Sequence, residues 1–144
     1  DFTNCQKAIE EQNLLGRVWL LPSIPEQEKK VLLNSADLVV SPNIKTEGTM
    51  EGFGINVLEA GACGRVVLAS GIEGLRDAIK DGENGILLKS GNADAWAGKI
   101  KELLKKDQFR IDFGKKAKRF VAEQYSWDKI ARAYLDDMKK TPKE

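Results

Sequence analysis

The chain has 144 residues, of which 42% are hydrophobic and 31% are charged. This balance is typical of a globular protein, and the length predicts a single domain over residues 1–144. The 23 basic and 22 acidic side chains leave a net charge of +1, which argues against a nucleic-acid partner because binding to phosphates needs a basic excess. No apolar run approaches the ~20 residues that a membrane-spanning helix requires.

Histidine is absent, which excludes Ser-His-Asp and Cys-His catalytic arrangements and most zinc sites. The cysteines, Cys5 and Cys63, lie far apart and lack the CxxC spacing of a metal or redox site. A reduced protein in the cytoplasm is therefore expected. Any chemistry must use carboxylates, hydroxyls, backbone groups and cations.

The first part of the chain has the pattern of a parallel sheet with crossover helices. Residues 2–13 are expected to form a helix that ends near Gly16. Four apolar runs follow, and their lack of alternation is typical of strands that are buried on both faces. These runs are residues 18–21, 38–40, 66–69 and 86–88. Helices are expected at 26–35 and 54–63, and a short turn-rich segment at 74–80.

Beyond the fourth run, apolar residues recur only at helical spacing. This spacing predicts helices on residues 96–104, 113–121 and 127–138. Ser126 suits the N-cap of the last helix, because its hydroxyl can accept from a free backbone N–H. The predicted fold class is α/β, a parallel sheet flanked by helices and followed by C-terminal helices.

Ligands of such folds bind beyond the carboxyl ends of the strands. That rule points to the loops at 22–26, 41–54 and 70–75. The middle loop is the most unusual, because Gly52 and Gly54 stand at an expected helix start and let a ligand approach the backbone. A helix N-terminus offers unpaired N–H groups and a partial positive charge, which suit a phosphate.

Two carboxylates, Glu51 and Glu59, bracket this glycine turn. They would repel a diphosphate, whereas their acceptor oxygens match the paired donors of a sugar diol. The pattern therefore indicates a ligand with phosphate in the middle and hydroxyl-rich rings on both sides, such as a nucleotide sugar. From spacing alone another interpretation stays open, with Glu51 as a capping carboxylate near the helix dipole and Glu59 as a solvated helix residue.

Residues 51–70, with the pattern EGFGI-x-x-LEA-x-ACG-x-VV-x-AS, resemble the nucleotide-sugar signature of the family-four retaining glycosyltransferases. Further segments at 35–42, 81–87 and 125–127 resemble motifs of the same family in the same order. The resemblance covers roughly residues 14–138. It implies a Rossmann-like nucleotide-sugar-binding domain that is part of a GT-B C-terminal domain.

The resemblance also implies roles for individual residues. Glu51 would be the catalytic residue that contacts hydroxyls of the transferred hexose, and Glu59 would accept from the ribose hydroxyls. Backbone amides of the turn would meet the sugar and the distal phosphate. The implied donor-binding residues are Gly52, Phe53, Gly54, Ile55 and Glu59, with Ser23 and Ile24 as weaker candidates near the base. Neither a metal nor a separate cofactor is expected.

One departure from the family concerns its opening strand and Lys-containing helix, which supply an Arg and a Lys to the diphosphate. Nothing before residue 18 matches these elements. The chain is therefore expected to be the later part of a C-terminal domain, without the N-terminal acceptor domain and inactive by itself.

The implied function is the donor-binding part of a retaining, metal-independent glycosyltransferase. It would move a hexose from a nucleoside-diphosphate sugar to a glycan, lipid or small-molecule acceptor. A non-catalytic nucleotide-sugar-binding module and a glycogen or starch synthase-like enzyme remain the alternatives. The basic residues in 115–119 and 139–143 are expected to be solvated rather than to contact the inner face of a membrane.

Overall fold

The computed structural model describes residues 2–46, 48 and 52–140. Contacts within the chain divide it into two compact units, Asp1–Val31 and Leu32–Glu144, called here the N-terminal unit and the main unit. The prediction of a single domain over the whole chain stays a prediction.

The N-terminal unit begins with the predicted helix, α1 (Phe2–Glu11). The chain then turns, with positive φ angles at Asn13 and Gly16. The prediction of a strand at 18–21 is wrong, because this run has no regular secondary structure and Trp19 is 70% exposed. A strand needs a hydrogen-bonded neighbour, and no described strand pairs with this run. Helix α2 (Glu26–Ser35) follows as predicted.

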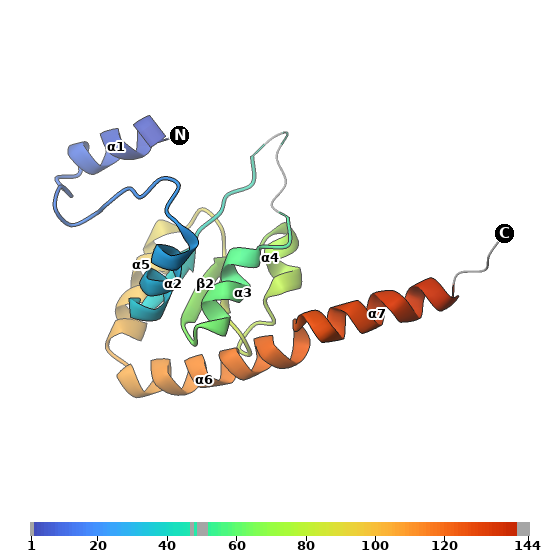
Figure 1. Ribbon diagram of the computed structural model, residues 1–144. Helices are drawn as coiled ribbons and strands as arrows, with labels where there is room; N and C mark the ends of the chain where they lie inside the picture. Colours follow the sequence, from blue (N-terminus) through green and yellow to red (C-terminus); the bar gives the residue numbers. More distant parts are fainter. Residues whose placement is uncertain (1, 47, 49–51, 141–144) are drawn as a thin grey trace. The chain divides into compact units, whose positions relative to one another are not determined.

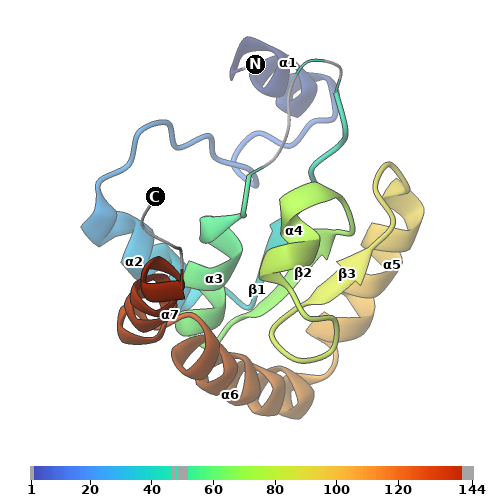
Figure 2. The same cartoon turned by 90° about the vertical axis from the view of Figure 1, so that its right-hand side faces the viewer.

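The main unit is built on a three-stranded parallel sheet with the order β1-β2-β3 (Figure 2). The strands are β1 (Leu38–Ser41), β2 (Val66–Ser70) and β3 (Ile86–Leu88), and they confirm the other predicted strands. Every residue of the central strand β2 is buried. Helices cover both faces of the strand, which accounts for its unbroken apolar sequence.

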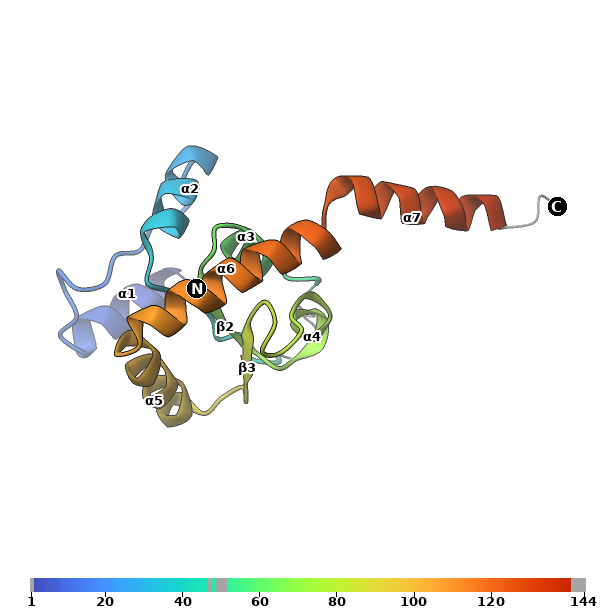
Figure 3. The same cartoon turned by 90° about the horizontal axis from the view of Figure 1, so that it is seen from below.

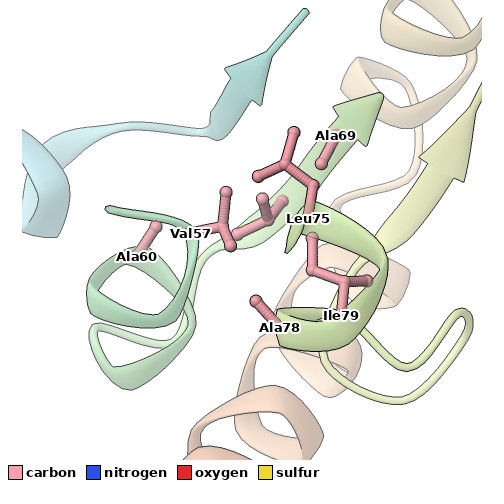
Figure 4. Close-up of a cluster of buried hydrophobic side chains, with 7 residues drawn as sticks. Val57, Ala60, Ala69, Leu75, Ala78 and Ile79 are labelled. Atoms are coloured by element: carbon pink, nitrogen blue, oxygen red, sulfur yellow. The ribbon is translucent and has the colours of Figure 1, made fainter. Parts of the chain in front are cut away.

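Successive side chains of β2 point to opposite faces of the sheet. Val67 and Ala69 pack against α3 (Ile55–Ala62) and α4 (Glu73–Ala78), in the cluster drawn in Figure 4. The side chains on the other face of β2 pack against α5 (Ala93–Leu104) and α6 (Asp107–Gln124).

Helix α4 corrects the prediction of a turn-rich segment at 74–80. It has only six residues, too few to be stable by propensity alone. Leu75 and Ala78 are fully buried against the sheet, so the helix is held by packing that a short sequence window does not reveal.

The predicted C-terminal helices are confirmed, and α7 (Trp127–Lys140) extends away from the rest of the main unit (Figures 1 and 3). Its N-cap is Ser126, whose Oγ accepts from the Lys129 amide at 3.4 Å. The apolar face of α7 is open to solvent, with Trp127 85% exposed. None of the described helices has both the length and the apolar content to cross a membrane.

Candidate functional site

The loop from β1 to α3 leaves the carboxyl edge of the sheet, where the sequence predicts the site. Glu51, the predicted catalytic residue, lies outside the described residues, so its role stays a prediction. Gly52, Phe53 and Gly54 are described and lead directly into α3.

Gly54 is the N-cap of α3 and has a left-handed conformation, with φ 71° and ψ 51°. Glycine adopts this conformation without steric cost. Its carbonyl accepts from the Val57 amide at 3.1 Å. Because Gly54 has no side chain, it makes no side-chain hydrogen bond to the amides at the start of α3, and a helix N-terminus of this kind suits an anion.

Close packing holds this turn against the start of α4. A Cβ atom on Gly74 would overlap the carbonyl oxygen of Gly52, and a Cβ atom on Gly54 would lie 2.6 Å from Cδ2 of Leu75. The backbones therefore meet directly at this point, which only glycine permits. Sequence reasoning identified Gly52 and Gly54 but missed Gly74, whose partner lies on another element.

The Phe53 ring packs against Tyr125, at the C-terminal end of α6. The ring centroids are 5.7 Å apart with an interplanar angle of 65°, an edge-to-face arrangement. The Tyr125 hydroxyl donates to the carbonyl oxygen of Asp77 in α4, at 3.1 Å. Burial and, to a smaller extent, the charge of Asp77 raise the pKa of this hydroxyl. Tyr125 therefore connects the glycine turn to α4 and α6.

Glu59 lies in the second turn of α3 and is half-buried. Residues four apart share a helix face, so Glu59 lies on the face that begins at Ile55. The Ile55 side chain is 68% exposed, which shows that this face is open at its N-terminal end. The start of α3 is therefore accessible at Ile55, and the half-buried Glu59 follows one turn later on the same face.

Hydrogen bonds join the loops that follow the strands. The Ser41 hydroxyl donates to Oδ1 of Asn43 at 2.7 Å, and the Ser90 hydroxyl donates to the Asn43 carbonyl oxygen at 2.8 Å. The Gly71 amide donates to the carbonyl oxygen of Leu88 at 2.8 Å. The loop after β3, with Ser90, was missed in the sequence, although the polar residues after the fourth apolar run were a usable signal.

Ser23 and Ile24, predicted near the nucleotide base, belong to the N-terminal unit. Ser23 has a φ of 53° and lies in a turn, where such a conformation is ordinary turn chemistry. Their role in donor binding stays a prediction.

Comparisons with known proteins connect this geometry to a family. A family model described as glycosyl transferases group 1 matches residues 1–120. The chain is 36% identical over 136 residues to D-inositol 3-phosphate glycosyltransferase of Paenarthrobacter aurescens, a match that covers 94% of this chain and 32% of that protein. It thus spans about a third of the length of the curated relatives it matches.

Solved structures share the fold. Sucrose-phosphate synthase from Thermosynechococcus elongatus superposes with a TM-score of 0.81 at 25% identity, over 96% of this chain and 35% of that one. TarM of S. aureus, in a complex that contains UDP, has a TM-score of 0.77 at 32% identity, over 93% of this chain and 26% of that one. HepE of Anabaena, in complex with UDP-glucose, has a TM-score of 0.81 at 21% identity, over 97% of this chain and 37% of that one.

The resemblance drawn from residues 51–70 is confirmed by these matches. The parallel sheet, its flanking helices and its helical C-terminus are those of a GT-B C-terminal domain. With a family model that matches residues 1–120, the chain belongs to the glycosyl transferases group 1 family.

Proposed function

We propose that this chain is the donor-binding part of a retaining, metal-independent glycosyltransferase. The enzyme moves a hexose from a nucleoside-diphosphate sugar to a glycan, lipid or small-molecule acceptor. The observation that carries the proposal is the N-terminus of α3, where Gly54 has no side chain to cap the helix and the half-buried Glu59 lies one turn after the exposed Ile55.

The proposed donor matches this arrangement group by group. The diphosphate lies at the amides of Ile55 and Asn56, where the helix dipole favours negative charge. The carboxylate of Glu59 accepts from the ribose hydroxyls, and Glu51 orients the hexose. TarM, which is 32% identical to this chain and was crystallised with UDP, supports a uridine nucleotide among the possible donors.

In the proposed reaction, the bond between the anomeric carbon and the diphosphate breaks through a transition state with oxocarbenium character. Negative charge then builds on the departing phosphate, and the α3 amides stabilise it. One such donor contributes about 2.7–4 kcal/mol in sites of this kind. The departing phosphate takes the proton of the acceptor hydroxyl as that oxygen bonds to the anomeric carbon on the same face, which retains the configuration.

The sequence has neither histidine nor an Asp-x-Asp motif, so no residue of this chain requires a metal in the proposed reaction. The acceptor binds through an N-terminal domain outside this chain, and the isolated chain is inactive. The enzyme works in the cytoplasm, and its proposed partners include neither a nucleic acid nor a membrane surface.

Calorimetric titration with UDP-glucose, GDP-mannose and ADP-glucose tests donor binding by the folded chain. Saturable binding of one of these sugars is expected. Absence of binding to all of them would contradict the proposal. A transfer assay on the longer enzyme then separates the alternatives, because a non-catalytic module binds the donor without transferring the hexose.

A further inference from the structure

We infer that Tyr125 is a positioning residue for the donor site, because it holds Phe53 and thereby keeps the glycine turn in the conformation that presents the α3 amides. The inference rests on the proposed function for the identity of the ligand. The positioning itself is a property of the protein without ligand, so it can be tested separately.

The contacts of Tyr125 reach elements on either side of the turn. Its ring meets the Phe53 ring edge to face at 5.7 Å, and its hydroxyl donates to the Asp77 carbonyl oxygen in α4 at 3.1 Å. The centroid of the Phe120 ring, in α6, lies 6.3 Å from that of the Tyr125 ring. Tyr125 is therefore fixed by its own helix and by α4, and it can restrain a third element.

The turn is the element that needs restraint. Phe53 stands between Gly52 and Gly54, and glycine gives a backbone the greatest conformational freedom. The Phe53 side chain is 43% exposed, and its ring contacts the ring of Tyr125. Loss of that contact leaves the segment with its packing against α4 but without the restraint on its middle residue, at the point where the first amides of α3 must be aligned.

The hydroxyl and the ring of Tyr125 have separable parts in this arrangement. The ring contacts Phe53, whereas the hydroxyl anchors the ring to α4. Burial raises the pKa of the hydroxyl, so it remains a neutral donor at physiological pH. Tyr125→Phe keeps the ring and loses only the hydrogen bond to α4, whereas Tyr125→Leu loses the ring and the hydrogen bond.

The chain also offers a matched control at the other end of α6. Phe109 and Phe113 form an aromatic pair with ring centroids 5.5 Å apart, and Phe109 is 43% exposed, like Phe53. Phe109→Leu therefore removes an aromatic contact of similar size that is remote from the turn. It reports the general effect of such a loss on the protein.

The first readout is hydrogen exchange of the Val57 amide, measured by NMR without ligand, because its bond to the Gly54 carbonyl oxygen reports whether the turn is formed. Tyr125→Leu should raise this rate at least about threefold above that of Phe109→Leu. Tyr125→Phe should restore most of the protection. Phe53→Leu removes the contact from the other side and replaces Tyr125→Leu if that variant does not fold.

The second readout is the Kd for whichever of UDP-glucose, GDP-mannose and ADP-glucose the wild-type chain binds. Tyr125→Leu should raise it about threefold to tenfold, Tyr125→Phe by less, and Phe109→Leu not at all. An unchanged Val57 exchange rate in Tyr125→Leu overturns the positioning role, whether or not a donor binds. Failure of the wild type to bind any of these sugars would instead count against the proposed function, while the exchange result still decides the role of Tyr125.

Discussion

Gly74, in the first turn of α4, lies against the backbone of Gly52 so closely that there is no room for a Cβ atom between them. The next residue, Leu75, is fully buried and occupies the space where a side chain at Gly54 would stand. The start of α4 and the turn before α3 therefore pack as one body. Protein interiors have little spare volume, so a larger side chain at the start of α4 must displace the turn before α3.

Gly74→Ala should lower the free energy of unfolding by about 1–3 kcal/mol, because the methyl group would overlap the Gly52 carbonyl oxygen and push the elements apart. Gly98→Ala is the control, since Gly98 lies within helix α5 and a Cβ atom there meets nothing within 4 Å. That substitution should raise stability by about 0.4–1 kcal/mol. Urea denaturation measures the free energy of unfolding of both variants. A Gly74→Ala protein as stable as the wild type would show that the close approach of Gly74 to Gly52 is absent in solution.

The sheet could be predicted from sequence because its central strand is buried on both faces. The unbroken run from Val66 to Ala69 has that environment, and the structure places it between two helical layers. The run at 18–21 is also unbroken and apolar, but it has no pairing partner among the described strands. An apolar run therefore predicts a buried strand in both cases, but the run at 18–21 is exposed, because strand formation also depends on which neighbour is present.

The candidate site was predicted only in part. Gly52 and Gly54 were identified because local glycine patterns report backbone conformation. Gly74 and Tyr125 were missed as site residues because their importance comes from contacts with residues distant in the chain. Such contacts arise from tertiary packing, and a single sequence does not contain the register that creates them.

Ser70 ends the central strand with a fully buried side chain. Within the described part of the chain, its Oγ is a buried polar atom without a hydrogen-bond partner. Burial of an unsatisfied hydroxyl is unfavourable, so Ser70→Ala should leave the free energy of unfolding unchanged or raise it by up to about 1 kcal/mol. Thermal unfolding measures this, and a loss above about 1 kcal/mol would reveal a partner for the hydroxyl.

The raised pKa of Tyr125 predicts a stability change at alkaline pH. The folded state holds the phenolic proton more tightly than the unfolded chain does. Tyrosines of the unfolded chain ionise at about pH 10. The free energy of unfolding is therefore unaffected below that pH and falls as the pH rises toward the higher folded pKa. Tyr125→Phe should lack this part of the decline, so urea denaturation of both proteins from pH 8 to 11 should show a shallower fall for the variant. Parallel curves would contradict the prediction.

The central claim is that the α3 N-terminus and Glu59 bind a nucleoside-diphosphate sugar, and calorimetry on a carboxylate variant tests it most directly. A hydrogen bond to a charged group contributes about 1.5–3 kcal/mol, so Glu59→Gln should weaken donor binding about tenfold to 100-fold. Glu102→Gln is the control, because that exposed carboxylate on α5 pairs with Lys99 and Lys106, and it should leave the Kd unchanged. Equal donor affinity in the wild type and Glu59→Gln would contradict the account.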